Sequence, residues 1–297
     1  MPVSTYAQGL SYRAFGGLKS QTFGDGLTQS LSYDNRLRVT DWAVGNVLGW
    51  QYSYSDLGEN TGRVMFAKNT ASSTNAGQRD DTLDRSYDYD HLGRLIVSHS
   101  GYEARLHMSR QQPGDPTTFG PYSHHYGYDQ WGNRTYREGW GGIYGSYVHD
   151  YPAYTNNRLN GYSYDASGNL TNDGVQSYSY DATGQQTYAS ATASSSFDGD
   201  RLRVKKVEGA ATTYYLRSSV LGGQVVYEMD ASGSWTRGYV YQGGQMLAIQ
   251  SGGVNWVHQD PTNRGQTWRE ETSLAGLDLE GAAAGVWDHA GATLLGA

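Results

Sequence analysis

Residues 164–187 read YDASGNLTNDGVQSYSYDATGQQT, so the motif Tyr-Asp-x-x-Gly occurs at Tyr164 and again at Tyr180. Related segments begin at residues 33, 54, 89, 128, 197 and 229. A motif that recurs along a chain marks a repeated supersecondary unit, and missing it would misassign the whole fold. The repeat is therefore the feature that most constrains what this chain can form.

The aspartate and the glycine of the motif have the spacing of the first and fourth positions of a type I β-turn. Asp165 is placed to accept hydrogen bonds from backbone N–H groups of its own turn. Gly168 is placed to adopt the positive φ of a three-residue hairpin loop with a G1 bulge. The same pair recurs as Asp181 with Gly184, as Asp129 with Gly132, and as Asp90 with Gly93. We therefore predict that each motif is one hairpin corner.

The segments beside the corners have the period of β-strands. In residues 177–180, tyrosines fall on one face and serines on the other, and short strands of this kind follow up to residue 260. The corner tyrosines are expected to stack as cross-strand aromatic pairs, each worth roughly 0.2–1 kcal/mol. They include Tyr89, Tyr128, Tyr164 and Tyr180. The predicted fold is all-β and consists of repeated antiparallel hairpins.

Composition excludes several classes of protein. The formal net charge is −7, and Lys and Arg form no dense run, which argues against a nucleic-acid partner. Cysteine is absent, so the sequence holds neither a disulfide framework nor a thiolate metal site. The first residues lack the basic and apolar regions of a signal peptide, and no apolar stretch reaches the length of a membrane span. We predict neither a signal peptide nor a membrane span in this chain.

Side chains that could carry chemistry have simpler structural explanations. Asp88 and Asp90 are a potential acid pair, but Asp90 belongs to a corner. His124 and His125 are adjacent, so in a strand they point to opposite faces and do not easily share a metal. Ser123 precedes a histidine without the G-x-S-x-G turn of a hydrolase. We predict no enzymatic activity, catalytic residue, metal or cofactor, although buried acids with raised pKa values would favour a glycosidase.

Aromatic side chains leave a second function open. Trp131, Trp140, Tyr144 and Tyr147 could form a platform on which sugar rings stack, because an aromatic face is apolar and its polar group can donate a hydrogen bond. Packing within the sheet is the competing explanation. A carbohydrate-binding module is therefore the alternative function.

The order of the segments carries a family resemblance. YDASGNLTNDG, YDATGQQT, FDGDRLRVKKV, TTYYLRSSVLGGQVVYEMDASG, YVYQGGQMLAIQ and VNWVHQD together resemble the Rhs, or YD-repeat, proteins over roughly residues 6–265. The resemblance implies a long β-sheet wound in a spiral into a hollow shell, as in bacterial toxin-encapsulating proteins and teneurins. This chain would form a partial shell or cocoon.

The resemblance also implies a function. Residues 1–270 are expected to be a YD-repeat β-shell segment, and the Ala- and Gly-rich residues 271–297 a divergent tail that is too short to be a toxin domain. The implied role is a structural scaffold that encloses or presents a polypeptide, such as a C-terminal toxin of its own full-length chain. The implied location of the full-length protein is exported or at the cell surface.

Overall fold

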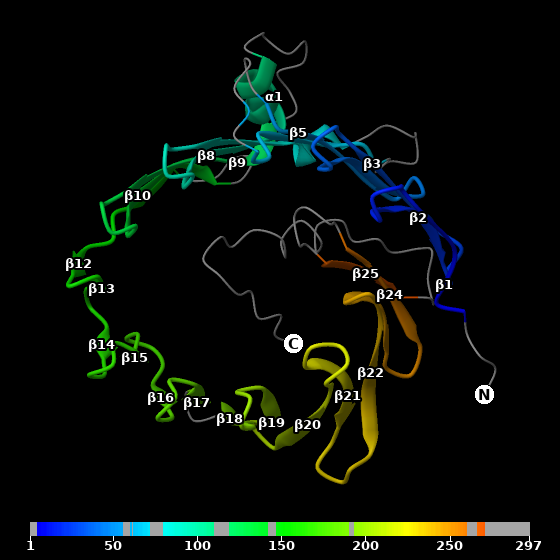
Figure 1. The fold of residues 1–297 in the computed structure, drawn as a ribbon. Helices are drawn as coiled ribbons and strands as arrows, with labels where there is room; N and C mark the ends of the chain where they lie inside the picture. Colours follow the sequence, from blue (N-terminus) through cyan, green and yellow to red (C-terminus); the bar gives the residue numbers. More distant parts are fainter. Residues whose placement is uncertain are drawn as a thin grey trace. The chain divides into compact units, whose positions relative to one another are not determined.

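The computed structural model describes residues 5–55, 60, 62–71, 80–109, 119–141, 147–189, 193–259 and 266–270. Within these residues nearly every regular element is an antiparallel β-strand, and strands that follow one another in the sequence are neighbours in a sheet (Figure 1). The prediction of an all-β fold of repeated antiparallel hairpins is confirmed. The predicted tail, residues 271–297, lies outside the described residues.

The described residues group into two compact units. One unit comprises Leu10–Gln21 and Leu27–Tyr162. The other comprises Thr22–Gly26, the residues before Leu10 and the residues after Tyr162.

One sheet has the strand order β1 to β11 without a crossover. Its strands are β1 (Ala7–Tyr12), β2 (Leu18–Phe23), β3 (Thr28–Tyr33), β4 (Val39–Val44), β5 (Leu48–Ser53), β6 (Phe66–Asn69), β7 (Arg85–Tyr89), β8 (Leu95–Ser100), β9 (Phe119–Tyr128), β10 (Arg134–Gly141) and β11 (Tyr147–Asp150). Where β7 pairs with β8, the register shifts by one residue between Asp88 and Tyr89, directly before a corner.

The second large sheet has the order β16 to β25. Its strands are β16 (Tyr178–Tyr180), β17 (Gln186–Ala189), β18 (Ala193–Phe197), β19 (Arg203–Glu208), β20 (Ala211–Ser218), β21 (Gln224–Met229), β22 (Trp235–Gln242), β23 (Gln245–Gln250), β24 (Val254–Gln259) and β25 (Gln266–Glu270). Two short hairpins precede it in the sequence: β12 (Tyr154–Thr155) with β13 (Arg158–Leu159), and β14 (Ser163–Tyr164) with β15 (Leu170–Asn172).

Helical structure interrupts the strands around residues 81–109. A 3₁₀ turn, η1 (Asp81–Leu83), precedes β7, and an α-helix, α1 (Gly101–Ser109), follows β8. The sequence analysis does not predict α1. Gly101, the first residue of α1, has a φ of +59°, which turns the chain away from β8. No helix in the described part of the chain is long and apolar enough to cross a membrane.

The apolar core of the unit that holds α1 follows the period of its strands. In β4, Trp42 and Val44 are buried, and in β3 Leu31 is buried two residues after the buried Gln29. In α1, which packs on β7 to β9, Ala104 has no exposed area. Polar residues at the start of β7 and just before it, Asp84, Arg85 and Ser86, are equally buried, so this core contains charge that has to be paired.

Candidate functional site

The corners all use the same backbone hydrogen bonds. At Asp165, the backbone N–H donates to the carbonyl of Asn169 over 2.9 Å, and the N–H of Gly168 donates back to the carbonyl of Asp165 over 3.1 Å. Gly168 has a φ of +91°. The same pattern is present at the corners that begin at residues 34, 90, 129, 181, 198 and 230. The positive φ and the register shift together form the hairpin loop with a G1 bulge.

The aspartate side chain stabilises the corner by accepting hydrogen bonds from groups of its own turn. One carboxylate oxygen of Asp165 accepts the backbone N–H of Asn169 at 2.8 Å, and the other accepts the Asn169 side-chain amide at 2.9 Å. The side-chain bond and then the backbone bond lower the pKa of Asp165. The pKa of Asp181 is lowered by the Thr183 hydroxyl and then by the Gln185 backbone N–H. The carboxylates therefore belong to the turns as anions.

Two corners keep the geometry without the glycine. Leu37, three residues after Asp34, has a φ of +64°, and Arg201, three residues after Asp198, has a φ of +63°. Both stand where the other corners have glycine, and both donate their N–H to the aspartate carbonyl in the same way. The side-chain bonds of the aspartate are thus sufficient to hold an L-residue in a conformation that normally costs roughly 1–2 kcal/mol.

Several corner tyrosines join their own corner to the corner before it. The Tyr128 hydroxyl donates to the carbonyl of Leu95 over 2.8 Å, and the Tyr89 hydroxyl donates to the carbonyl of Val64 over 3.0 Å. In each case the acceptor lies two residues after the positive-φ residue of the preceding corner, Gly93 or Gly62. We call this hydrogen bond the tyrosine stitch. It recurs as Tyr33 to Leu18, Tyr54 to Val39 and Tyr241 to Val225.

An arginine covers the ring of the stitched tyrosine. Arg94 lies 4.9 Å from the ring centroid of Tyr128, and Arg38 lies 4.1 Å from that of Tyr54. The arginine directly follows the positive-φ residue, so the segments LRV at 37–39, GRV at 62–64 and GRL at 93–95 each supply one cation and one acceptor carbonyl. The sequence analysis missed this signal.

At these positions the corner tyrosines do not stack on one another as predicted, because an arginine lies over each ring. Successive corners on one edge of a sheet are two strands apart, about 9.5 Å, whereas aromatic rings pair at roughly 4.5–7 Å between centroids. The guanidinium of Arg94 fills this gap, because it contacts Asp90, the Tyr128 ring and the backbone carbonyl of Asp129 together. The ladder consists of alternating arginine and tyrosine.

Residues other than tyrosine also bond one corner to the next. Asn133 donates from its side chain to the side-chain oxygen of Asn157 over 3.0 Å, and Gln185 donates to the carbonyl of Arg201 over 2.6 Å. Tyr164 and Tyr180 end β14 and β16, each directly before its corner, and burial raises the pKa of Tyr180. Gly132 and Gly184 have φ values of +90° and +79°.

Of the residues named for sugar stacking, Trp131 lies apart from Trp140 and Tyr147. Trp131 lies at the tip of a corner with 68% of its surface exposed, whereas Tyr147 begins β11 with 42% exposed. The backbone of Trp140 pairs with that of Tyr147 at the far end of β10 from the corner, roughly 20 Å away by strand rise. Tyr144 lies outside the described residues. Trp131 and Tyr147 therefore lie at opposite ends of β10.

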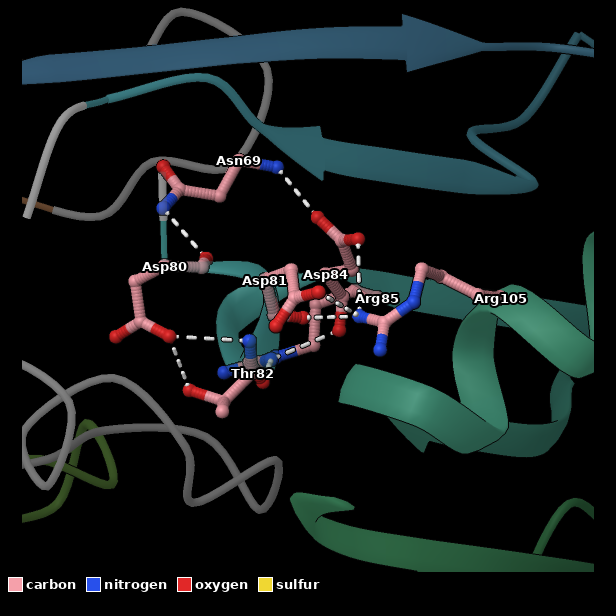
Figure 2. A network of polar contacts seen from close by, with 7 residues as sticks. All are labelled: Asn69, Asp80, Asp81, Thr82, Asp84, Arg85 and Arg105. Carbon is pink, nitrogen blue, oxygen red and sulfur yellow. Dashed lines mark hydrogen bonds and ion pairs between the residues drawn. The ribbon is translucent and has the colours of Figure 1, made fainter. Parts of the chain in front are cut away.

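A buried polar network attaches α1 to the sheet (Figure 2). The Arg105 guanidinium of α1 donates to the carbonyl of Asp81 over 2.7 Å and lies 3.4 Å from a carboxylate oxygen of Asp84. Asp84, with no exposed side-chain area, also accepts the backbone N–H of Asn69 at 2.9 Å. Asp80 caps η1 by accepting the N–H of Thr82. The network joins β6, η1 and α1.

A second polar cluster joins α1 to β7. His107 of α1 lies 3.0 Å from the carboxylate of Asp88 through Nε2 and 3.1 Å from the hydroxyl of Ser86 through Nδ1. Ser86 has no exposed area, so a substrate has no access to its hydroxyl. Ser123, which the sequence places beside His124, is bonded instead to His99 at 2.7 Å. Groups of acids and histidines that could hold a metal are absent from the described residues.

A shallow depression of about 520 Å³ lies over β20 to β23. Its polar walls are bonded within the sheet: the Tyr239 hydroxyl donates to Glu228 over 2.6 Å, and Arg217 donates to the carbonyl of Gly223 over 2.8 Å. Burial and the Glu228 carboxylate raise the pKa of Tyr239 to about 12. These groups cross-link neighbouring strands.

Comparison with known proteins identifies the fold. No model of a protein family matches the sequence, and no curated protein matches it. The Tc holotoxin pore of Photorhabdus luminescens, solved as a TccC3 mutant, is similar with a TM-score of 0.65 and 15% sequence identity, over 90% of this chain and 15% of that chain. The TcdB2–TccC3 complex is similar with a TM-score of 0.46 and 18% identity, over 89% of this chain and 14% of that chain.

The second similarity is too low to support an argument, and the first concerns the fold alone. The chain spans about 15% of the length of the holotoxin chain that it matches. The antiparallel hairpin fold of this chain is thus similar to part of a Tc holotoxin pore.

Proposed function

We propose that this chain is a scaffold segment of a YD-repeat β-shell, and that the full-length protein encloses or presents a polypeptide. The observation that carries the proposal is the tyrosine stitch with its arginine cover. The stitch recurs at Tyr33, Tyr54, Tyr89, Tyr128 and Tyr241, and an arginine covers the ring at Tyr54, Tyr89 and Tyr128. Hairpins joined in this way extend the sheet by repeating one local contact. The role requires no covalent chemistry.

The fold similarity to a toxin component supports this role. In the family that the sequence resembles, the shell encloses a toxin, and the matched structure is a holotoxin pore. We further propose an exported or cell-surface location for the full-length protein and a cargo that is part of its own polypeptide.

The binding of an unfolded polypeptide tests the proposal. A fluorescein-labelled, reduced and carboxymethylated polypeptide is titrated with the intact 297-residue chain, and anisotropy and protection from thermolysin are measured. We expect anisotropy to rise and cleavage to slow. Unchanged anisotropy with cleavage as fast as in buffer would contradict the scaffold role.

A glycan array is the matched counter-test for the carbohydrate-binding alternative. We expect no binding, because Trp131 and Tyr147 lie at opposite ends of β10 and do not form one platform. Binding that is lost in Trp140→Ala would favour the sugar-stacking function over the scaffold.

A further inference from the structure

Three imidazoles meet between α1 and the strands β7 to β9, and one carboxylate lies among them. The His99 ring of β8 lies 5.1 Å from the His107 ring of α1 and 5.6 Å from the His125 ring of β9, measured between centroids. The carboxylate is Asp88 of β7, which lies 3.0 Å from His107. A second carboxylate, Glu138 of β10, is the cross-strand partner of His125. Asp88 and Glu138 can each compensate one imidazolium, at His107 and at His125, so a proton on His99 adds a charge without a carboxylate of its own, within about 6 Å of the other two rings.

Burial and the neighbouring imidazoles lower the pKa of His99, and Asp88 is the carboxylate that raises it by a smaller amount. The groups that face His99 are Asp88 from β7, His107 from α1, and His125 with the more distant His124 from β9. His124 belongs to the opposite face of β9, where its ring stacks on Tyr122. Ser123 contributes a neutral hydroxyl, bonded to Nδ1 of His99.

We propose that α1 is an acid-released cover over the β7–β9 face, which docks while His99 is neutral and detaches when His99 becomes protonated. The device goes beyond the scaffold function and does not depend on it. The link is direct, because the His99 ring lies 5.1 Å from the ring of His107, through which α1 is attached to Ser86 and Asp88.

The direction and size of the effect follow from proton linkage. Burial first, and then the neighbouring charges of His107 and His125, lower the pKa of His99 from 6.5 to about 4 in the docked state. A histidine whose pKa is lowered by docking binds its proton more tightly when undocked, so docking is strongest above pH 6.5 and weakens down to pH 4. At pH 5 a full return of the pKa from about 4 to 6.5 corresponds to a shift of about 30-fold toward release, and this is the upper limit because His124 and His125 of β9 stay beside His99 when α1 leaves.

A spin label on the helix tests the proposal. The chain has no cysteine, so Met108→Cys provides one labelling site near the end of α1. We expect the label on the full chain to be immobile at pH 7.5 and to become mobile with a midpoint between pH 6.5 and pH 4. Far-UV circular dichroism at pH 5 should still show the strands, which separates release of the helix from global unfolding.

Two variants and one control decide the cause. His99→Gln keeps a hydrogen-bonding partner for Ser123 but does not titrate, so the label should stay immobile at pH 5. His125→Gln, at an exposed position, should lower the midpoint of the transition without abolishing it. His149→Gln, on the exposed face of β11, should leave the transition unchanged. An immobile label at pH 4.5 in the unsubstituted cluster, a midpoint that neither variant shifts, or loss of the strands at the same pH would each overturn the proposal.

Discussion

Removing one tyrosine hydroxyl measures what the stitch contributes. In Tyr128→Phe the ring remains under the Arg94 guanidinium, while the hydrogen bond to the Leu95 carbonyl, 2.8 Å long, is lost. A single hydrogen bond contributes about 1 kcal/mol net, within a range of roughly 0.5–1.5 kcal/mol. We therefore expect the free energy of unfolding to fall by about 1 kcal/mol. Urea unfolding followed by tryptophan fluorescence measures it.

A control variant and a double variant test whether the lost stability of Tyr128→Phe comes from the stitch. Tyr12→Phe removes the hydroxyl of a tyrosine that is 56% exposed and outside the row of stitches, so it should change stability by less than about 0.5 kcal/mol. Tyr54 is stitched to a different corner, so Tyr54→Phe combined with Tyr128→Phe should give the sum of the two single effects. A Tyr128→Phe variant as stable as Tyr12→Phe would refute the stitch as a source of stability.

Three further predictions concern the corners and the helix network. Gly184→Ala and Leu37→Gly should change the free energy of unfolding in opposite directions by about 0.5–1 kcal/mol, destabilising and stabilising respectively, because both positions have positive φ and a Cβ at Gly184 would contact nothing within 4 Å. The lowered pKa of Asp165 and its counterparts means that the folded corners hold their protons more weakly than the unfolded chain. Their contribution should therefore be complete above about pH 5 and lost as the pH falls through the lowered pKa, which urea midpoints between pH 7 and pH 2.5 will show. Arg105→Ala should destabilise the protein by about 1–3 kcal/mol, because it removes a cation 3.4 Å from the buried Asp84, and thermal unfolding measures this loss.

Each of these predictions has an outcome that contradicts it. Equal signs for the two corner substitutions would reject positive φ as their common cause. A urea midpoint that stays constant down to pH 2.5 would show that the carboxylates do not act as anionic caps. An Arg105→Ala variant no less stable than Arg36→Ala, a change at an exposed corner position, would reject the buried pair as the anchor of α1.

The corners follow from the sequence because their interactions are local. Asp165 bonds to groups no more than four residues away, and Gly168 supplies the φ, so the pattern Asp-x-x-Gly predicts the turn without knowledge of the rest of the fold. The antiparallel hairpins follow from the turns in the same way. The motif also marked the corners at residues 34 and 198, although they lack the glycine.

Tertiary structure alone decided what joins one hairpin to the next. The Tyr128 hydroxyl reaches a carbonyl 33 residues back, and Arg105 reaches Asp81 and Asp84 across an intervening hairpin. Such contacts depend on how many strands separate two corners, which the spacing of a motif does not reveal. The helix α1 escaped prediction for the same physical reason: much of its attachment is to buried polar groups on β7 and η1, rather than to a strong helical pattern of its own.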